Sequence, residues 1–520
     1  VKAIPLDMLP LEEVDISERW KGMYWGYGQK ILAAAQIIKR NPRLFAIYIS
    51  NFSCGPDSFI SHFFQKELKD KPFLQIEIDE HSADAGIITR LEAFLDSLKN
   101  VRAEKMDELS APRFRVIRFD GKKRTIYIPR MADHAYALSA AFQACGNPAE
   151  VIPESDEESV RLGRKYTSGR ECYPCILTTG NMIRMLKSPG FDPDRSAFFM
   201  PSTNGPCRFG QYFRLQRMLL DELGYSNVPI FSFNQDESIY RECQVVGKEF
   251  TRLAWQGIVA IDILEKKLRE VRPYEKNPGE ADQIYQYYLQ QVFDCIKKKK
   301  DPAEVLIRAR NDFRNLSIEK GIKKPVIGIV GEIYIRSNSF SNENLVREIE
   351  SLGGEVWLPP IGEWIFYTNF TALRHSLRNR NWSNFLRTLI TNIYQKYDEH
   401  HLSKVFARDL KNYPEPTTKE TIQNASPYLD STFEGEAILS IGKAVDFVRK
   451  GVNGIINVMP FTCMPGTIVN SLLKKFREIE RKVPVLNMAY DGQEQTNTRT
   501  RLEAFLYQVR QFGDYHHSLQ

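Results

Sequence analysis

The sequence predicts an α/β protein of two or three parallel-sheet lobes with a helical connector between them. Apolar, β-branched runs alternate with helical stretches of ten or more residues, which is the pattern of parallel strands joined by crossover helices. A unit of strand, cysteine loop, helix, strand, aspartate loop and helix occurs twice, and both copies contain the heptapeptide TRLEAFL, at 89–95 and at 500–506. At 520 residues the chain is also too long for a single hydrophobic core.

The first copy of this duplicated unit covers residues 20–100. A helix over 20–40 leads to the strand LFAIYIS, the loop of Cys54, a second helix, the strand FLQIEID and a helix that Thr89 opens, with Glu92 completing a capping box. In the second copy Cys463 follows the strand GIINVMP, and Thr500 opens the last helix. The matched order and spacing indicate an internal duplication.

A simpler strand, helix and strand unit begins at 124, at 196 and at 324. Gly146, Gly224 and Gly353 stand where its helix ends and a left-handed cap is favoured. Mostly helical sequence fills 243–322 and again 370–412. We therefore expect a first α/β region over 1–240, a helical connector over 241–323 and a second α/β domain over 324–520, with lobes of the Rossmann or flavodoxin type.

Composition and charge exclude several classes of protein. The chain has 71 basic and 65 acidic residues, and the basic ones are scattered, so we expect no nucleic-acid partner. No run approaches the roughly 18 apolar residues of a membrane span. The chain opens at Val1 without a signal peptide, which indicates a cytoplasmic protein that is a fragment of a longer polypeptide or a separate subunit. No phosphate-binding glycine loop occurs, so any ATP has to be hydrolysed by another chain or domain.

Cysteine loops are the most informative feature for function. We expect them at the carboxyl ends of parallel strands, where α/β proteins bind ligands. In each loop Pro or Gly lies within two residues of the cysteine, which predicts an open turn whose N–H groups point inward and lower the thiol pKa. The four cysteines are Cys54, Cys172, Cys207 and Cys463. Cys172 also forms a C-x-x-C pair with Cys175, ahead of a helix that we expect to begin near Thr178.

Several kinds of chemistry are open to these thiols. A structural zinc site needs a second close pair of cysteines, which the sequence lacks. A redox dithiol would use only Cys172 and Cys175. Thiols gathered from separate loops fit an iron–sulfur cluster best. Cys243 and Cys295 lie in helical sequence without Gly or Pro, and we expect them to be small buried hydrophobes.

Other polar residues are candidates near such a centre, although no catalytic residue stands out. His81 and His134 are candidates for proton transfer. Arg208 directly follows Cys207, where a cation can tune a cluster or bind an anionic substrate. Asp79 and its counterpart Asp491 are interpreted as the residues that turn the two aspartate loops.

Long motifs give the chain a family resemblance that covers nearly its whole length. NFSCGPDSF, DEHSADAGIITRLEAFLDSL, RECYP, MPSTNGPCRFGQY and FTCMPG resemble the cluster-bearing subunits of 2-hydroxyacyl-CoA dehydratases and benzoyl-CoA reductases, the double-cubane cluster proteins, and the carboxyl-terminal part of large activase-related proteins. The resemblance implies α/β lobes around a [4Fe–4S] cubane or an [8Fe–9S] double cubane. By the family pattern the ligands are Cys54, Cys172, Cys207 and Cys463, with Cys145 and Cys175 completing six in a double cubane.

The resemblance also implies a partner and a reaction. An actin- or Hsp70-like activase would hydrolyse ATP and deliver an electron of very low potential, in an anaerobic setting. We therefore expect an iron–sulfur oxidoreductase that reduces a small molecule or an acyl-CoA type substrate. The three-cysteine arrangement of the dehydratase subunits is not obvious, and the sequence shows no recognisable acyl-CoA pocket. A non-catalytic electron carrier or scaffold module is the alternative, a zinc-stabilised binding protein is the third, and assembly into a homo-oligomer is left open.

Overall fold

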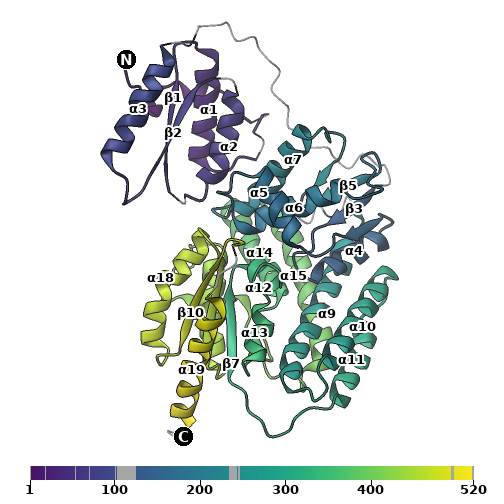
Figure 1. Ribbon diagram of the computed structural model, residues 1–520. Helices are drawn as coiled ribbons and strands as arrows, with labels where there is room; N and C mark the ends of the chain where they lie inside the picture. The colour runs from purple at the N-terminus through teal and green to yellow at the C-terminus, as the bar shows by residue number, and fades with distance from the viewer. Residues whose placement is uncertain are drawn as a thin grey trace.

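The computed structural model describes residues 2–517, apart from 18, 21, 53, 70, 100, 102–123, 234–242, 244–245 and 494–496. Within this part of the chain the strands form three sheets, and every strand pair in them is parallel (Figure 1). The predicted α/β class is therefore confirmed. The first α/β region contains two of the three sheets, so the described chain has three lobes.

Lobe 1 (residues 26–98) is a two-stranded sheet with three helices. Its elements are α1 (Gly26–Arg40), β1 (Ala46–Asn51), α2 (Asp57–Leu68), β2 (Phe73–Ile78) and α3 (Asp84–Leu98). The pairing of β1 with β2 begins with Ala46 opposite Phe73. Burial alternates along β1, because only one face of this small sheet is covered by helices.

Lobe 2 (residues 124–233) has a four-stranded sheet in the order β4-β3-β5-β6. Its elements are β3 (Thr125–Ile128), α4 (His134–Ala144), β4 (Ala149–Val151), α5 (Glu157–Tyr166), α6 (Tyr173–Leu186), β5 (Ser196–Phe199), the 3-10 turn η3 (Arg208–Gln211), α7 (Tyr212–Glu222) and β6 (Ile230–Phe231). Every residue of β5 is buried, which fits a central strand covered on both faces.

The helical connector follows lobe 2, as predicted. It comprises α9 (Phe250–Val271), the 3-10 turn η4 (Arg272–Tyr274), α10 (Glu280–Lys297) and α11 (Ala303–Asn315). Helix α9 is the centre of the largest hydrophobic cluster, in which Trp255, Ile261 and Leu264 are buried against residues of α4, α10 and α11. The connector is therefore packed into the body of the protein.

Lobe 3 (residues 326–517) has a second four-stranded sheet, in the order β10-β9-β7-β8. Its elements are β7 (Val326–Gly331), α12 (Ile333–Ser337), α13 (Leu345–Ser351), β8 (Glu355–Trp357), α14 (Ile361–Arg378), α15 (Trp382–Ser403), the 3-10 turn η5 (Lys404–Phe406), α16 (Thr418–Ala425), α17 (Glu436–Arg449), β9 (Gly454–Pro460), α18 (Met464–Ile479), β10 (Val485–Tyr490) and α19 (Thr498–His517). The run from β9 to α19 repeats the element order of β1 to α3, as the predicted duplication requires.

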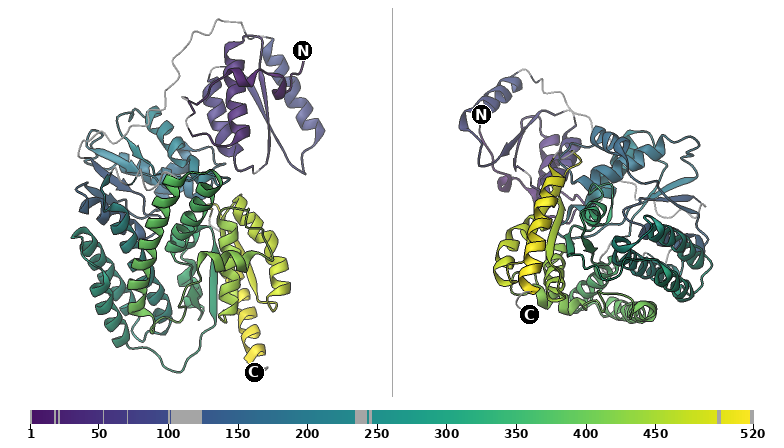
Figure 2. Two further views of the ribbon diagram at one scale, coloured as in Figure 1. Left: turned by 180° about the vertical axis from the view of Figure 1, so that it is seen from behind. Right: turned by 60° about the horizontal axis from the view of Figure 1, so that its bottom comes forward.

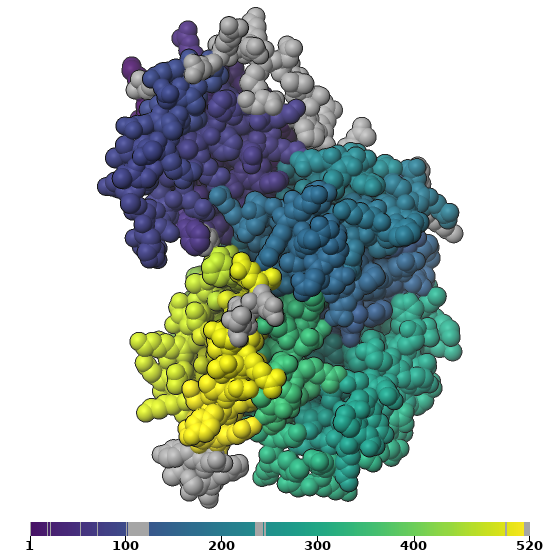
Figure 3. Space-filling view, in the orientation of Figure 1, coloured from purple at the N-terminus to yellow at the C-terminus, as the bar shows by residue number. Residues whose placement is uncertain are grey.

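Lobe 1 adjoins the other two lobes. Lobe 1 lies at the top of Figure 1, and the space-filling view places it against lobe 2 and next to the upper end of lobe 3 (Figures 1 and 3). Its contacts with lobe 2 include the ion pair of Lys66 with Glu222 at 2.5 Å, and directly before the lobe the indole nitrogen of Trp25 donates to the Gly205 carbonyl at 3.0 Å. None of the described helices is both long enough and apolar enough to cross a bilayer.

Four predicted helix starts are wrong. Helix α1 begins at Gly26, six residues after the predicted start at residue 20. Helix α3 begins at Asp84, so Thr89 lies inside it and its hydroxyl donates to the Ala85 carbonyl instead of capping the helix. Helix α19 likewise begins at Thr498, ahead of Thr500. Helix α6 begins at Tyr173, because Pro174 occupies its first turn, where the missing N–H of proline costs nothing.

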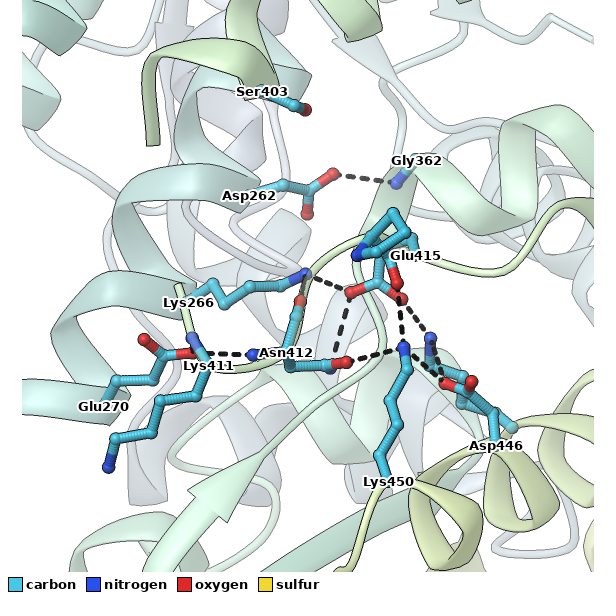
Figure 4. A network of polar contacts seen from close by, with 12 residues as sticks. Asp262, Lys266, Glu270, Gly362, Ser403, Lys411, Asn412, Glu415, Asp446 and Lys450 are labelled. Atoms are coloured by element: carbon cyan, nitrogen blue, oxygen red, sulfur yellow. Dashed lines mark hydrogen bonds and ion pairs between the residues drawn. The ribbon is translucent and has the colours of Figure 1, made fainter. Parts of the chain in front are cut away.

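A buried ionic network joins the connector to lobe 3 (Figure 4). The carboxylate of Glu415 accepts from Lys266 of α9 and from Lys443 of α17. Burial alone would raise the pKa of Glu415, but these two lysines outweigh burial and lower the pKa to about 2. The network thus fixes the connector against the helices that cover the sheet of lobe 3.

Candidate functional site

Three of the four cysteines that the sequence singles out stand immediately before a helical turn, and the fourth, Cys54, lies in the loop that leads into a helix. Cys172, Cys207 and Cys463 are the N-cap residues of α6, η3 and α18, and Cys54 precedes the first residue of α2 by three positions. Helix N-termini favour negative charge, because their backbone N–H groups lack partners within the helix. Backbone amides at these positions therefore point toward the sulfur atoms, although they do not decide the protonation state of the thiols.

Arg208 connects the segments that carry these cysteines. Its Nη1 donates to the Ser58 hydroxyl at 3.3 Å and to the Arg170 carbonyl at 3.2 Å. Its Nη2 donates to the carbonyl and the hydroxyl of Thr462, at 3.0 and 3.2 Å. Ser58 follows Cys54 by four residues, Arg170 precedes Cys172 by two, and Thr462 is next to Cys463. One guanidinium, adjacent to Cys207 in sequence, therefore holds the other three cysteine segments from three lobes.

The cysteines lie close enough to Arg208 to affect its pKa. Burial alone would lower the pKa of Arg208, but Cys172, Tyr212, Cys463 and Cys207 together outweigh burial and raise it. Arg208 in turn opposes the rise in the pKa of Cys54 that burial causes. All four thiols are therefore coupled electrostatically to one buried cation, which is 6% exposed.

Burial raises the pKa of each of the four thiols. For Cys207 the pKa rises to about 12, and for Cys463 it rises well above its ordinary value. Backbone amides two or three residues further along each chain segment oppose this rise without overcoming it. The expectation that the turns lower the thiol pKa is wrong, because loss of hydration outweighs the amide dipoles. Protonated thiols are poor nucleophiles, and bound metal is what would deprotonate them.

Aromatic side chains contact two of the four cysteines. The hydroxyl of Tyr212 lies 2.5 Å from the sulfur of Cys172, and its ring stacks on Phe59 of α2 with centroids 6.0 Å apart. The hydroxyl of Tyr24 donates to the Cys207 carbonyl at 3.1 Å. The backbone of Thr462 has a φ of 64°, an unusual value for threonine that Arg208 helps to hold.

Two carboxyl groups of lobe 3 lie beside the thiols, and sequence reasoning missed both. Glu332 caps α12, where its Oε2 accepts from the Ile335 amide at 2.8 Å, and Glu436 opens α17. Burial raises the pKa of both, and Glu332 raises that of Glu436 further. Both also contribute to the raised pKa of Cys207 and Cys463. The available signal was the position of Glu332 at the carboxyl end of the apolar strand GIVG.

The thiols do not form a site for a single ion. Among the described residues, no group of three or more His, Cys, Asp or Glu side chains is placed to hold one metal ion. In a cubane each thiolate binds a different iron, so the sulfurs stand further apart than around one ion. Four thiols with a buried guanidinium are a donor set that fits such a cluster, since the cation offsets the negative charge of the thiolates.

Cys145 and Cys175 differ in how they relate to this group. Cys175 lies in the first turn of α6, fully buried, near Cys172 and Arg208. Cys145 follows the last residue of α4 and lies close to Gly247. Because a crossover helix runs back along its sheet, the end of α4 is at the edge opposite the strand carboxyl ends. The structure therefore does not bring Cys145 to the four-cysteine group.

The other predicted residues lie elsewhere. His134 is buried at the start of α4, and its Nε2 lies 2.9 Å from Oδ1 of Asp262, which also accepts from the Ile361 amide. His81 is exposed in the loop after β2. Cys172 does not follow a strand, since its loop joins α5 to α6. Cys243 and Cys295 are buried, as predicted.

The two aspartate loops have the predicted geometry. Oδ1 of Asp79 accepts from the His81 amide at 3.0 Å, and Oδ1 of Asp491 accepts from the Gln493 amide at 2.8 Å. Both contacts join residues two positions apart, as in an Asx-turn. These residues shape the duplicated loops, and this shared contact supports the duplication.

Fold and site together define an α/β protein with a thiol centre at the junction of three lobes. A scan against protein-family models found no match for the chain, and a search of curated proteins found none either. The motif resemblance described above therefore remains a prediction.

Proposed function

We propose that the four-cysteine group holds an iron–sulfur cluster and that the protein is an iron–sulfur oxidoreductase. The observation that carries the proposal is the set of hydrogen bonds from Arg208 to the segments of Cys54, Cys172 and Cys463. Four thiol-bearing segments that converge on one buried arginine indicate a shared ligand. A metal cluster is such a ligand, since it deprotonates thiols whose pKa burial raises.

The ligands in this proposal are Cys54, Cys172, Cys207 and Cys463, the set that the family resemblance also implies. When bound, such a cluster supplies one-electron chemistry at low potential. Arg208 holds the ligand segments and offsets negative charge. Cys175, one turn from Cys172, is available for a larger cluster, whereas Cys145 has no part in it.

Glu332 and Glu436 favour an enzyme over an electron carrier. A reduction that adds hydrogen to a substrate needs protons as well as electrons. Carboxyl groups whose pKa burial raises hold their proton to a higher pH than ordinary carboxyl groups do, and a carboxyl group that holds its proton can donate it. Both side chains retain some exposed surface, so neither is sealed in the core. We infer that they donate protons to a substrate at the thiol centre.

The electron source in this proposal is an activase of the actin/Hsp70-like type that hydrolyses ATP. The chain lacks the phosphate-binding glycine loops that would let it use ATP in the common way. We propose an anaerobic cytoplasm as its setting and a small molecule or an acyl-CoA type compound as its substrate. The resemblance in the motifs supports these assignments.

The direct test is an iron and acid-labile sulfide count on protein purified without oxygen, combined with an electron paramagnetic resonance spectrum. About four irons per chain indicate a cubane and about eight a double cubane. Protein that stays free of iron after anoxic purification and reconstitution contradicts the proposal. Zinc in place of iron would support the zinc-binding alternative instead.

A pair of cysteine variants locates the cluster. Cys207→Ser should lower the iron content at least severalfold and change the spectrum, because it removes one of four ligands. Cys295→Ser is the matched control, since Cys295 is buried in α10 away from the group. Equal iron in both variants would rule out Cys207 as a ligand.

Substitution of the two carboxyl groups tests whether the protein is an enzyme or an electron carrier. Glu332→Gln and Glu436→Gln should slow substrate reduction while leaving the iron content and the rate of electron uptake from the activase unchanged. A variant that loses electron uptake as well would indicate a structural role for the carboxyl groups. Full turnover in both variants would exclude the two carboxyl groups as the proton donors, whereas a wild type that takes up electrons but reduces no substrate would favour the carrier or scaffold alternative.

A further inference from the structure

Helix α15 exposes an unusual amount of apolar surface. Six of its apolar side chains are each more than half exposed, and we call them the α15 stripe: Trp382, Leu386, Ile390, Ile393, Tyr394 and Tyr397. The helix lies on the side of the protein that the left view of Figure 2 turns toward the reader, with α14 beside it. Contiguous exposed apolar patches of several hundred square ångströms mark interaction surfaces.

The inner face of α15 is polar, so the helix has the reverse of the usual polarity. Its buried residues include Asn384, Thr388, Gln395 and Asp398. Asp398 forms a two-pronged ion pair with Arg252 of α9, at 2.8 and 2.9 Å. A surface helix ordinarily turns its apolar stripe toward the core and its polar residues toward water.

Specific hydrogen bonds fix this reversed orientation. The Asn384 side chain donates to the Ser376 hydroxyl at 2.7 Å, and Asn369 of α14 donates to Oε1 of Gln395 at 2.6 Å. The indole nitrogen of Trp255 donates to the Gln395 carbonyl at 2.9 Å. A rotation of α15 that buried the stripe would break these bonds and leave buried polar groups unpaired. The stripe is therefore a fixed part of the fold.

The spacing of the stripe suits packing against another helix. Leu386 and Ile393 are seven residues apart, and so are Ile390 and Tyr397. A seven-residue apolar repeat keeps one face of a helix in contact with a partner helix. From Trp382 to Tyr397 the stripe is about 22 Å long, at about 1.5 Å per residue.

The size of the stripe matches what a dimer of identical chains needs. Two copies facing each other would bury roughly 1,000 Å² through these six side chains alone, which reaches the size of a specific interface. A twofold axis brings the same patch of both chains together, so the interface does not require a second, complementary patch elsewhere on the protein. Arg387 and Lys396 flank the stripe and remain at the rim, where they stay hydrated.

We propose that α15 is the contact surface of a homodimer, in which the α15 stripe of one chain packs against the same stripe of a second copy. The contact is independent of the cysteine centre, so it holds whether or not the protein binds a cluster. Helix α9 holds α15 in place from its buried side, through the contacts of Arg252 and Trp255.

Analytical ultracentrifugation of the 520-residue chain tests this proposal. The wild type should sediment as a dimer at micromolar concentration, and the double variant Ile390→Glu/Ile393→Glu should shift the dissociation constant upward by at least a hundredfold. The control is Tyr287→Glu on α10, which is comparably exposed, at 55%, and should leave the dimer intact. Circular dichroism spectra of all three proteins should coincide, because the substituted side chains point into solvent.

The opposite results are equally clear. A wild type that stays monomeric up to about 100 µM overturns the proposal. So does a dimer that the double variant leaves intact. Co-sedimentation of a monomeric wild type with vesicles of anionic phospholipid, lost in the double variant, would overturn it in favour of a membrane surface, since the stripe also carries Trp and Tyr between basic residues.

Discussion

Arg208 is the residue on which the geometry of the site depends most. A guanidinium has five N–H donors in a planar fork, which is why one side chain can hold segments from three lobes at once. Its partners Ser58, Arg170 and Thr462 each lie within four residues of a candidate ligand. A lysine has a single charged nitrogen and cannot span the same acceptors.

At the scale of this residue, Arg208→Lys should lower the free energy of unfolding by about 2–4 kcal/mol, because buried hydrogen bonds from a charged group are lost. Arg90→Lys is the control, since Arg90 is exposed and donates to the Gln75 carbonyl; it should change stability by less than about 0.5 kcal/mol. Denaturant titration measures both changes. Hydrogen exchange in α2 should accelerate only in Arg208→Lys, and unchanged exchange there would contradict a role in joining the lobes.

The order of elements could be predicted from sequence, and the site could be predicted only in part. The strands before Cys54 and Cys463 could be predicted from local sequence alone, because an apolar run followed by Gly or Pro is typical of a strand that ends in a turn. The start of α6 lies five residues before the predicted start near Thr178, because Pro174 is tolerated in a first turn. The bond from Arg208 to Thr462 spans 254 positions, and no local pattern encodes such a contact.

The turn between β7 and α12 shows how an element positions a site residue. Gly331 has a φ of 111°, and a Cβ there would lie 2.0 Å from the Val458 carbonyl oxygen. Only glycine allows β7 and β9 to approach this closely while the chain turns into Glu332. The position of the Glu332 carboxyl therefore depends on the glycine before it.

At the scale of elements, Gly331→Ala should lower the free energy of unfolding by more than about 3 kcal/mol, because backbone strain and a steric clash add. Gly190→Ala is the matched control: its φ is 84°, but nothing lies within 4 Å of the added Cβ, so about 1–2 kcal/mol of strain is expected. Thermal and denaturant unfolding compare the two variants. Equal losses would show that the close approach at Gly331 does not matter.

At the scale of the whole molecule, ionic contacts link the parts of the chain. Glu415 with Lys266 and Lys443 fixes the connector to lobe 3, as Figure 4 shows for Glu415 and Lys266. The pKa of Glu415 is about 2 in the folded chain against an ordinary 4.5. A carboxyl group whose pKa is lowered by folding adds stability above its unfolded pKa, and that stability disappears as the pH falls through the folded value.

The stability that Glu415 adds should therefore be complete above pH 4.5 and decline toward pH 2. Glu415→Gln should lower the free energy of unfolding by roughly 3 kcal/mol at neutral pH. The difference from wild type should shrink as the pH falls from 5 to 3, which denaturant titration at several pH values measures. A difference that stays constant over this range would show that the charge of Glu415 is not what matters.

The central claim is that the thiols of residues 54, 172, 207 and 463 bind one metal cluster at the junction of three lobes. Diffraction from crystals of anoxically purified protein, collected at the iron absorption edge, tests it most directly. We predict one compact anomalous peak within bonding reach of the sulfurs of Cys54, Cys172, Cys207 and Cys463, next to Arg208. Iron-loaded protein whose anomalous signal lies elsewhere, or whose four sulfurs face separate surroundings, would contradict the account.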